Sequence, residues 1–267
     1  MIHIGTLHTS DERWIDVQLA QLERHTDEPY RIYASLAGID EAYRSRFDHT
    51  IDHTGRIRSK KPGRLGPDLA KCVMRLTDEM IERAEPDDVI VFMHSDAFPI
   101  ADWVGPVRGM LAERPLAAVR RDEIGEPIPH WCFCVTTAGF WSEIGGDWNR
   151  GPTWDDHGRE VTDMGARLWT DLDARGIDWY PILRTNAVDL HPVFFGIYGG
   201  IVYHHGAWSH IAMTRADARE YSHLPIPLRN FAGVRKRIAN TRLSHRMFRR
   251  IQEDERFHLE LTGERPE

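Results

Sequence analysis

Five consecutive apolar residues, Val89-Ile-Val-Phe-Met93, constrain the fold more than any other segment of the chain. The run follows Pro86-Asp87-Asp88 and stops at His94-Ser95-Asp96. A strand covered on one face alternates between apolar and polar residues, whereas a strand covered on both faces is apolar throughout. Because this run is short and sharply bounded, we predict a central strand buried between two layers.

The flanking segments alternate between strand-like and helix-like patterns. Helical spacing of apolar residues occurs over 11–22 and over about 67–80, and each segment begins with residues that favour a helix start. Further strands are predicted at 2–7, 30–36, 116–120, 131–137, 179–183 and 201–204. This alternation predicts an α/β sandwich with a mixed central sheet.

The composition excludes several classes of protein. Hydrophobic residues make up 41% of the chain and charged residues 28%, as in ordinary globular proteins, and the net charge of -7 argues against a nucleic-acid partner. The three cysteines are too few and too irregularly spaced for a disulfide framework or a zinc knuckle. We recognise neither a secretion signal nor a membrane span, so we expect a cytoplasmic protein.

The end of the buried strand carries the first candidate site residues. In open α/β sheets, ligands gather at the carboxyl ends of strands. Alternate residues of an extended backbone point to the same side, so we expect His94 and Asp96 to face one ligand and Ser95 to face away. A carboxylate there can anchor a divalent cation. The alternative is that Asp96 only caps the turn that follows.

A second candidate group follows the predicted strand at 201–204. From a strand, only one of the neighbouring His204 and His205 can face a pocket directly. We expect one of them to share a cation with Asp96, within about 6 Å and beside an open cleft, and we rank His205 slightly ahead. Gly206 would let the backbone approach a phosphate closely. The alternative is that both histidines are partly solvated and bind nothing.

The segment 89–100 resembles the DxD region of GT-A glycosyltransferases, in which an apolar strand ends in Asp-x-Asp before a small residue and an apolar-Pro turn. His94 stands where the first Asp of that motif would be, and Asp96 matches the second. The resemblance covers roughly residues 1–210, and the order of the motifs along the chain carries it. It implies a GT-A-like nucleotide-diphospho-sugar transferase sandwich over 1–228, with a nucleotide-sugar-binding half at about 1–105 and an acceptor half at 106–228.

The resemblance also implies a reaction and its ligands. A sugar would pass from a nucleotide-diphosphate sugar to the hydroxyl group of a glycan, a lipid-linked acceptor or a small molecule, with Mn²⁺ or Mg²⁺ as cofactor. His94 in place of an aspartate favours Mn²⁺, because imidazole is a ligand for transition metals. In many enzymes of this type a late histidine completes the metal site, and His204 and His205 occupy that place in the order.

The same resemblance nominates catalytic residues. Inverting GT-A enzymes use a carboxylate that begins a helix after a glycine-containing acceptor segment, which Thr136-Thr-Ala-Gly-Phe-Trp141 resembles. Asp163 is then the implied general base, and a plain helix N-cap is its alternative role. Asp155 and Asp156 either contact the acceptor or form a solvated loop pair.

Donor contacts are implied in three places: the end of the first strand, the basic loop at 59–64 whose cations can bind phosphates, and the turn after the buried strand. The residues are Thr6, His8, Lys60, Arg64, Ser95 and Asp96. The alternative for the loop is that it is solvated and binds nothing.

The C-terminal segment differs in composition from the rest, because residues 229–251 are rich in Arg and contain no Asp or Glu. We predict a basic helical extension over 229–267. It would either pack on the domain with a solvated basic face or lie on an anionic membrane surface, which would make the protein peripheral to the membrane.

Three other functions use the same residues. A nucleotidyltransferase would place a metal-bound triphosphate at the strand-end carboxylate, although no glycine-rich signature follows the first strand. A metal hydrolase would be built on His94, Asp96, His204 and His205. A catalytically inactive nucleotide-sugar-binding or scaffold protein is the fourth function considered, since the first Asp of the motif is missing.

Overall fold

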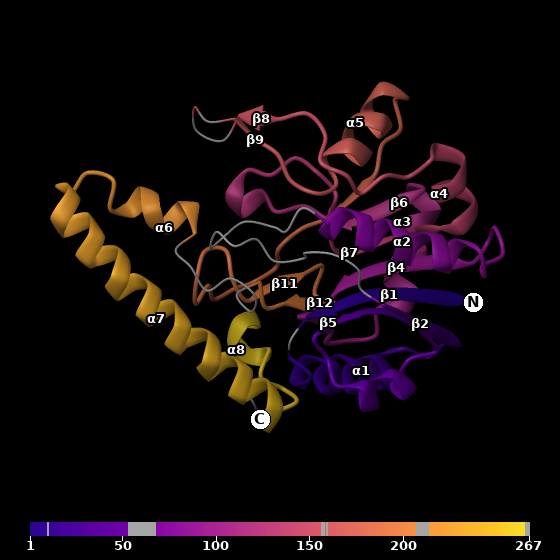
Figure 1. The fold of residues 1–267 in the computed structure, drawn as a ribbon, viewed down its shortest axis with the longest axis horizontal. Coiled ribbons are helices and arrows are strands. Elements are labelled where there is room, and N and C mark those ends of the chain that lie inside the picture. Colours follow the sequence, from indigo (N-terminus) through magenta and orange to yellow (C-terminus); the bar gives the residue numbers. More distant parts are fainter. Residues whose placement is uncertain (10, 53–67, 156–157, 159, 207–213, 265–267) are drawn as a thin grey trace.

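The computed structural model describes residues 1–9, 11–52, 68–155, 158, 160–206 and 214–264. These residues form a central sheet with helices around it (Figure 1). Within these residues, seven strands form the sheet in the order β10-β6-β7-β4-β1-β2-β3. They are β1 Ile2–Thr9, β2 Tyr30–Ala37, β3 His49–Asp52, β4 Val89–His94, β6 Leu116–Val119, β7 His130–Thr137 and β10 Tyr180–Ile182. β7 runs antiparallel to its neighbours β4 and β6, and the other pairs are parallel. The predicted mixed sheet is confirmed.

Helices cover both faces of this sheet. One face carries α1 (Arg13–His25) and α3 (Val104–Glu113). The other carries α2 (Leu69–Ile81), α4 (Ala138–Ile144) and α5 (Ala166–Ala174).

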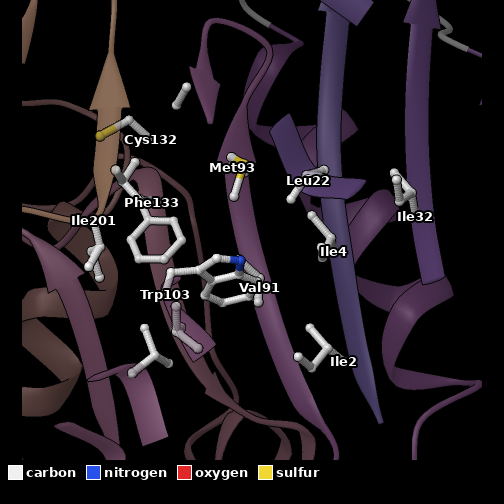
Figure 2. Packing of buried hydrophobic residues seen from close by; sticks show 14 of the residues in the cluster. Ile2, Ile4, Leu22, Ile32, Val91, Met93, Trp103, Cys132, Phe133 and Ile201 are labelled. Carbon is white, nitrogen blue, oxygen red and sulfur yellow. The ribbon is translucent and has the colours of Figure 1, made fainter. Parts of the chain in front are cut away.

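Strand β4 lies between the two layers, as its apolar run predicts. Val91 and Met93 belong to the core beneath α1 and α3, whereas Phe92 belongs to the core beneath α2. Figure 2 shows the first of these cores, where Val91 and Met93 lie near Ile4 of β1 and Leu22 of α1. Both faces of β4 are therefore buried by side chains from opposite layers.

A smaller antiparallel sheet joins distant parts of the chain. Its order is β11-β12-β5, and β5 follows directly on β4 after a two-residue turn. Its strands are β5 Ala97–Pro99, β11 Gly196–Tyr198 and β12 Val202–His204. The other short elements are β8 Trp154–Asp155, which pairs with β9 Glu160–Val161, and the 3₁₀ turns η1 Glu41–Arg46 and η2 Asp122–Ile124.

The C-terminal segment is helical, as predicted, with α6 Arg215–Glu220, α7 Ile226–Glu253 and α8 Leu259–Thr262. Met247 and Phe248 of α7 share a core with Phe98 of β5 and Tyr203 of β12. Residues beyond the predicted boundary near residue 228 therefore contribute to the core under the small sheet. Each helix in the described residues is too short or too polar to cross a membrane.

Candidate active site

Asp96 lies in the turn between the two sheets. β4 ends at His94, and β5 begins at Ala97 in the small sheet, so the chain changes sheets across Ser95 and Asp96. Gln18 of α1 holds this turn, because its Nε2 donates to the backbone oxygens of His94 and Ala97, both at 2.7 Å. Asp96 is 8% exposed, and its Oδ2 accepts the backbone N–H of Gly206 at 3.1 Å.

Strand β12 brings His204 to the same turn. β12 pairs with β5 so that His204 stands opposite Ala97. His204 Nε2 lies 3.5 Å from Asp96 Oδ1, and His94 Nδ1 lies 3.8 Å from the same oxygen. One ligand atom from each of the three residues lies within 4.8 Å of the others. The expected closeness of Asp96 to a late histidine is therefore present.

His205 points away from this group, so ranking it ahead of His204 is wrong. Its Nδ1 lies 2.9 Å from the hydroxyl of Tyr203, and its Nε2 lies 2.8 Å from Ser244 Oγ of α7. Its ring packs against Trp14, with a centroid separation of 4.9 Å. Because both ring nitrogens have partners on the far side of β12, His205 anchors α7 instead of facing Asp96.

The charges of this group suit a cation. Burial raises the pKa of the Asp96 carboxyl, but His204 and the other nearby imidazoles outweigh burial and hold it well below its usual range. Burial and neighbouring charges lower the pKa of His94 well below its ordinary value, so His94 is neutral. Burial would also lower the pKa of His204, but the Cys132 sulfur and the Asp96 carboxylate raise it to about 10.

Two imidazoles and one carboxylate form a common ligand set for transition metals, so the donor set suits a divalent metal. The raised pKa of His204 favours its protonated form in the absence of an ion, so a metal would compete with a proton for this nitrogen.

Residues at the start of β7, which the sequence analysis did not nominate, surround the group. The His130 ring lies 5.3 Å from the His94 ring and 6.0 Å from the His204 ring. The Cys132 side chain raises the pKa of His204, and the centroid of the Trp131 ring lies 3.9 Å from that of the His94 ring. The sequence predicts a strand at 131–137, but it does not show that this strand lies beside β4. Only the order of the strands in the sheet shows that.

A cavity of about 180 Å³ lies close to this group, with Arg121, Glu126, Trp154, Thr162 and Asp163 in its lining. Burial is the main cause of the low pKa values of His94 and His130, and the charge of Arg121 lowers both further. The cavity lining does not include His94, Asp96 or His204. This cavity therefore lies beside the group, and a cleft that opens onto Asp96 and a late histidine stays a prediction.

Asp163 lines this cavity and is not a helix N-cap. Helix α5 has Gly165 at its N-cap, and Asp163 Oδ1 accepts the backbone N–H of Met164 at 2.8 Å. Its Oδ2 lies 3.8 Å from a guanidinium nitrogen of Arg121. Asp155 is exposed in β8, where its Oδ1 accepts the N–H of Gly158 at 3.2 Å. Asp156 lies outside the described residues.

The donor residues expected on β1 do not face a cleft. Thr6 and His8 are fully buried, and both contact Gln18 Oε1, at 3.0 and 3.1 Å. They point towards α1 because alternate residues of β1 continue the face that Ile2 and Ile4 bury. Ser95 is half-buried in the turn, and its donor role stays a prediction. Lys60 and Arg64 lie outside the described residues.

No protein-family model matches this chain, and no curated protein matches it. Among solved structures, it is similar to a mannosyltransferase from Pyrobaculum calidifontis in complex with GDP-Man and Mn²⁺, with 12% identity and a TM-score of 0.45 over 67% of this chain and 54% of that one.

It is also similar to TarS from S. aureus (11% identity, TM-score 0.38, 55% of this chain and 30% of that one) and to the glycosyltransferase GlyE from Streptococcus pneumoniae TIGR4 (16%, 0.36, 54% and 35%). The chain thus spans about half the length of the mannosyltransferase and about a third of the other two. All three TM-scores lie below 0.5.

Proposed function

We propose that this chain is a glycosyltransferase that moves a sugar from a nucleotide-diphosphate sugar to a hydroxyl acceptor with the help of a divalent metal. The observation that carries the proposal is the group formed by His94, Asp96 and His204, whose ligand atoms lie within 4.8 Å of one another at a strand end. This is the edge of an α/β sheet at which ligands bind.

The proposed metal ligands are the carboxylate of Asp96 and one ring nitrogen each of His94 and His204. Two nitrogen donors make Mn²⁺ a better fit than Mg²⁺, which prefers oxygen ligands. A cation held there would neutralise the charge of the departing nucleoside diphosphate.

The neighbouring cavity is the proposed acceptor site. Asp163 is the carboxylate proposed to take the proton of the acceptor hydroxyl, and Arg121 fixes its position from 3.8 Å away. Trp154 in the same lining offers a flat apolar face on which a sugar ring can stack. A glycan or a sugar-bearing lipid fits this lining.

A panel of nucleotide-diphosphate sugars, each incubated with Mn²⁺, Mg²⁺ or EDTA, tests the proposal through the product released. Release of a nucleoside diphosphate with Mn²⁺ but not with EDTA is the expected result. Asp96→Asn should abolish this release and leave the melting temperature of the metal-free protein within a few degrees. Asp87→Asn, which removes an exposed carboxylate just before β4, at the end of the strand opposite Asp96, is the matched control and should retain activity.

Other outcomes would exclude the proposal. If Asp96→Asn prevents folding, Asp96 is a structural residue of the turn. Release of a sugar phosphate and a nucleoside monophosphate would indicate a metal hydrolase that cleaves the diphosphate with water. Formation of a sugar phosphate and a nucleoside triphosphate only when pyrophosphate is added would indicate a nucleotidyltransferase. The hydrolase has some support, because two histidines and one carboxylate also hold ions that activate water. Tight nucleotide-sugar binding without turnover would indicate a catalytically inactive binding protein.

A further inference from the structure

Only the second half of helix α7, residues Ile226–Glu253, packs on the core under the small sheet. Its buried residues in the second half include Ser244, Met247 and Ile251. Its first half projects away from the central sheet together with α6 (Figure 1). Gly233 is the buried residue of this first half.

The face of α7 opposite the buried residues begins with exposed apolar side chains. Phe231, Val234 and Ile238 follow the spacing of one helical face and are 63%, 58% and 46% exposed. Leu228 continues this line towards the start of the helix and is 57% exposed. Large apolar residues in a row at such exposure are unusual on a monomer and mark an interaction surface.

The same face continues with basic side chains. Arg235 lies within the apolar row, and Arg242, Arg246 and Arg249 follow towards the end of the helix, all exposed. The last three line one surface groove. From residue 226 to residue 252, α7 contains no Asp or Glu. We call these four arginines together with Leu228, Phe231, Val234 and Ile238 the outer face of α7.

We propose that the outer face of α7 docks on an anionic lipid membrane. Such a surface presents negative headgroups to arginines and an acyl boundary into which apolar side chains insert. A nucleic acid would satisfy the arginines but leave the apolar row in water. Self-association through this face would bring two sets of four arginines together, with Glu253 at the end of each helix as the one acid in α7. Charge complementarity therefore favours anionic lipid.

This docking would also place the candidate active site near the membrane. Ser244 of α7 hydrogen-bonds His205, the neighbour of His204, at 2.8 Å. Helix α7 is thus fixed to the strand that carries the metal-site histidine. The docking proposal itself is independent of the enzyme's chemistry, and binding to lipid tests it without a turnover assay.

Co-sedimentation with vesicles tests the proposal, using phosphatidylcholine alone and a mixture of phosphatidylcholine with phosphatidylglycerol. We expect the full chain to bind the anionic mixture and not the neutral vesicles, and to bind more weakly as salt is raised. Changing Phe231, Val234 and Ile238 together to Ser should reduce the bound fraction at least about tenfold. Changing the four arginines to Gln should do the same, whereas changing them to Lys should preserve binding.

The matched control is the double variant Leu183→Ser and Val188→Ser, which removes two exposed apolar side chains away from α7 and should bind as the unchanged protein does. All substituted positions on α7 are exposed, so the melting temperatures should agree. Three results would overturn the proposal: no binding to anionic vesicles, equal binding to neutral vesicles, or binding that survives both the Ser and the Gln variants. A concentration-dependent dimer that the Ser variant abolishes, without vesicle binding, would assign the face to a second copy.

Discussion

Among single residues, Gln18 connects β1 to the turn that contains Asp96. Its amide nitrogen bonds the two carbonyls that flank the Asp96 turn, and its oxygen accepts from Thr6 and faces His8. Burial lowers the pKa of His8 to about 4, so His8 is neutral at physiological pH and can donate its Nε2–H to Gln18. The network fixes the amide orientation of Gln18 and, through it, the turn.

We predict that Gln18→Leu weakens metal binding. The change removes the side-chain donor to the carbonyls of His94 and Ala97 and the acceptor of Thr6, which should lower the free energy of unfolding by about 1–3 kcal/mol. Mn²⁺ affinity should fall about 10- to 100-fold, because residues that orient metal ligands have effects of this size. Titration calorimetry and urea unfolding measure the two quantities. Gln21→Leu, another buried glutamine of α1, is the control, and equal losses of affinity in both variants would contradict the prediction.

A second residue-scale prediction concerns Asp163. If Asp163 accepts the acceptor proton, Asp163→Asn should lower kcat about 10²- to 10⁴-fold and leave the KM for the donor sugar unchanged. Steady-state kinetics with a fixed acceptor measures both. Gly165, not Asp163, caps α5, so the helix should persist in the variant. An unchanged kcat would remove Asp163 from the mechanism.

At this scale the sequence predicted part of the site. His94 and Asp96 follow from the rule that strand ends collect ligands, and His204 from its position after a later strand. Which of His204 and His205 faces Asp96 depends on which side of β12 each side chain points to. Pairing with β5 decides this, and β5 is a strand of three residues without a sequence signal of its own. His130 and Cys132 could not be predicted as neighbours of the site, because the sequence does not show that β7 pairs with β4.

Among the elements, α6 and α7 are joined at Asp217. Its buried carboxylate lies 3.4 Å from His191 Nε2, accepts from the backbone and hydroxyl of Thr214, and also accepts from Asn240 of α7 at 3.2 Å. Burial raises the pKa of Asp217, but the bonds from His191 and Thr214 outweigh burial and hold it well below its usual range. Ionised Asp217 therefore stabilises the folded state.

The sign of the pH dependence follows from that lowered pKa. A carboxyl with a depressed folded pKa contributes stability above its unfolded pKa of about 4 and loses it as the pH falls towards the folded value. We predict that Asp217→Asn unfolds more easily at pH 7, by about 1–3 kcal/mol, and that the difference shrinks below pH of about 4. Urea unfolding at several pH values measures it. A difference that is constant with pH would show that the charge of Asp217 does not matter.

The packing of α7 gives a second element-scale prediction. A chain that ends near Pro227 loses Met247, Phe248, Ile251, Phe257 and Leu261 from the core under the small sheet. Loss of several buried large side chains costs more than the whole stability of most domains. We expect this truncation to be insoluble or unfolded, as judged by expression and circular dichroism. A folded, nucleotide-binding product would show that 229–267 is a separable extension.

The sequence predicted helices and strands that have a long apolar pattern. It did not predict strands that form only through pairing with another strand. The run at 89–93 and the helical spacing at 69–80 correspond to β4 and α2. The short strands β5, β8, β9 and β11 have two or three residues each and form only because a partner strand is present. The insertion of antiparallel β7 between β4 and β6 is a property of the sheet and cannot be read from one segment.

For the whole molecule, metal binding should appear as stabilisation. A ligand that binds only the folded state adds about 2.7 kcal/mol at a hundred times its Kd, which corresponds to a rise of roughly 5–10 °C in melting temperature. We expect Mn²⁺ to raise the Tm and EDTA to reverse the rise. Asp96→Asn should remove the shift, whereas Asp87→Asn should retain it. An equal shift in Asp96→Asn would mean that the ion binds elsewhere.

The bond between Asp96 and Gly206 joins residues that are 110 positions apart. A ribosome that adds about 5–20 residues per second needs roughly 5–20 s to make the chain between them. During that interval β1, β2, β3 and β4 have been synthesised, but β5 still lacks its partner β12. The residues of the Asp96 turn are therefore synthesised early, and the residues that complete the contacts of Asp96 are synthesised later. A chain interrupted before residue 204 carries the parallel strands without the histidine that faces Asp96.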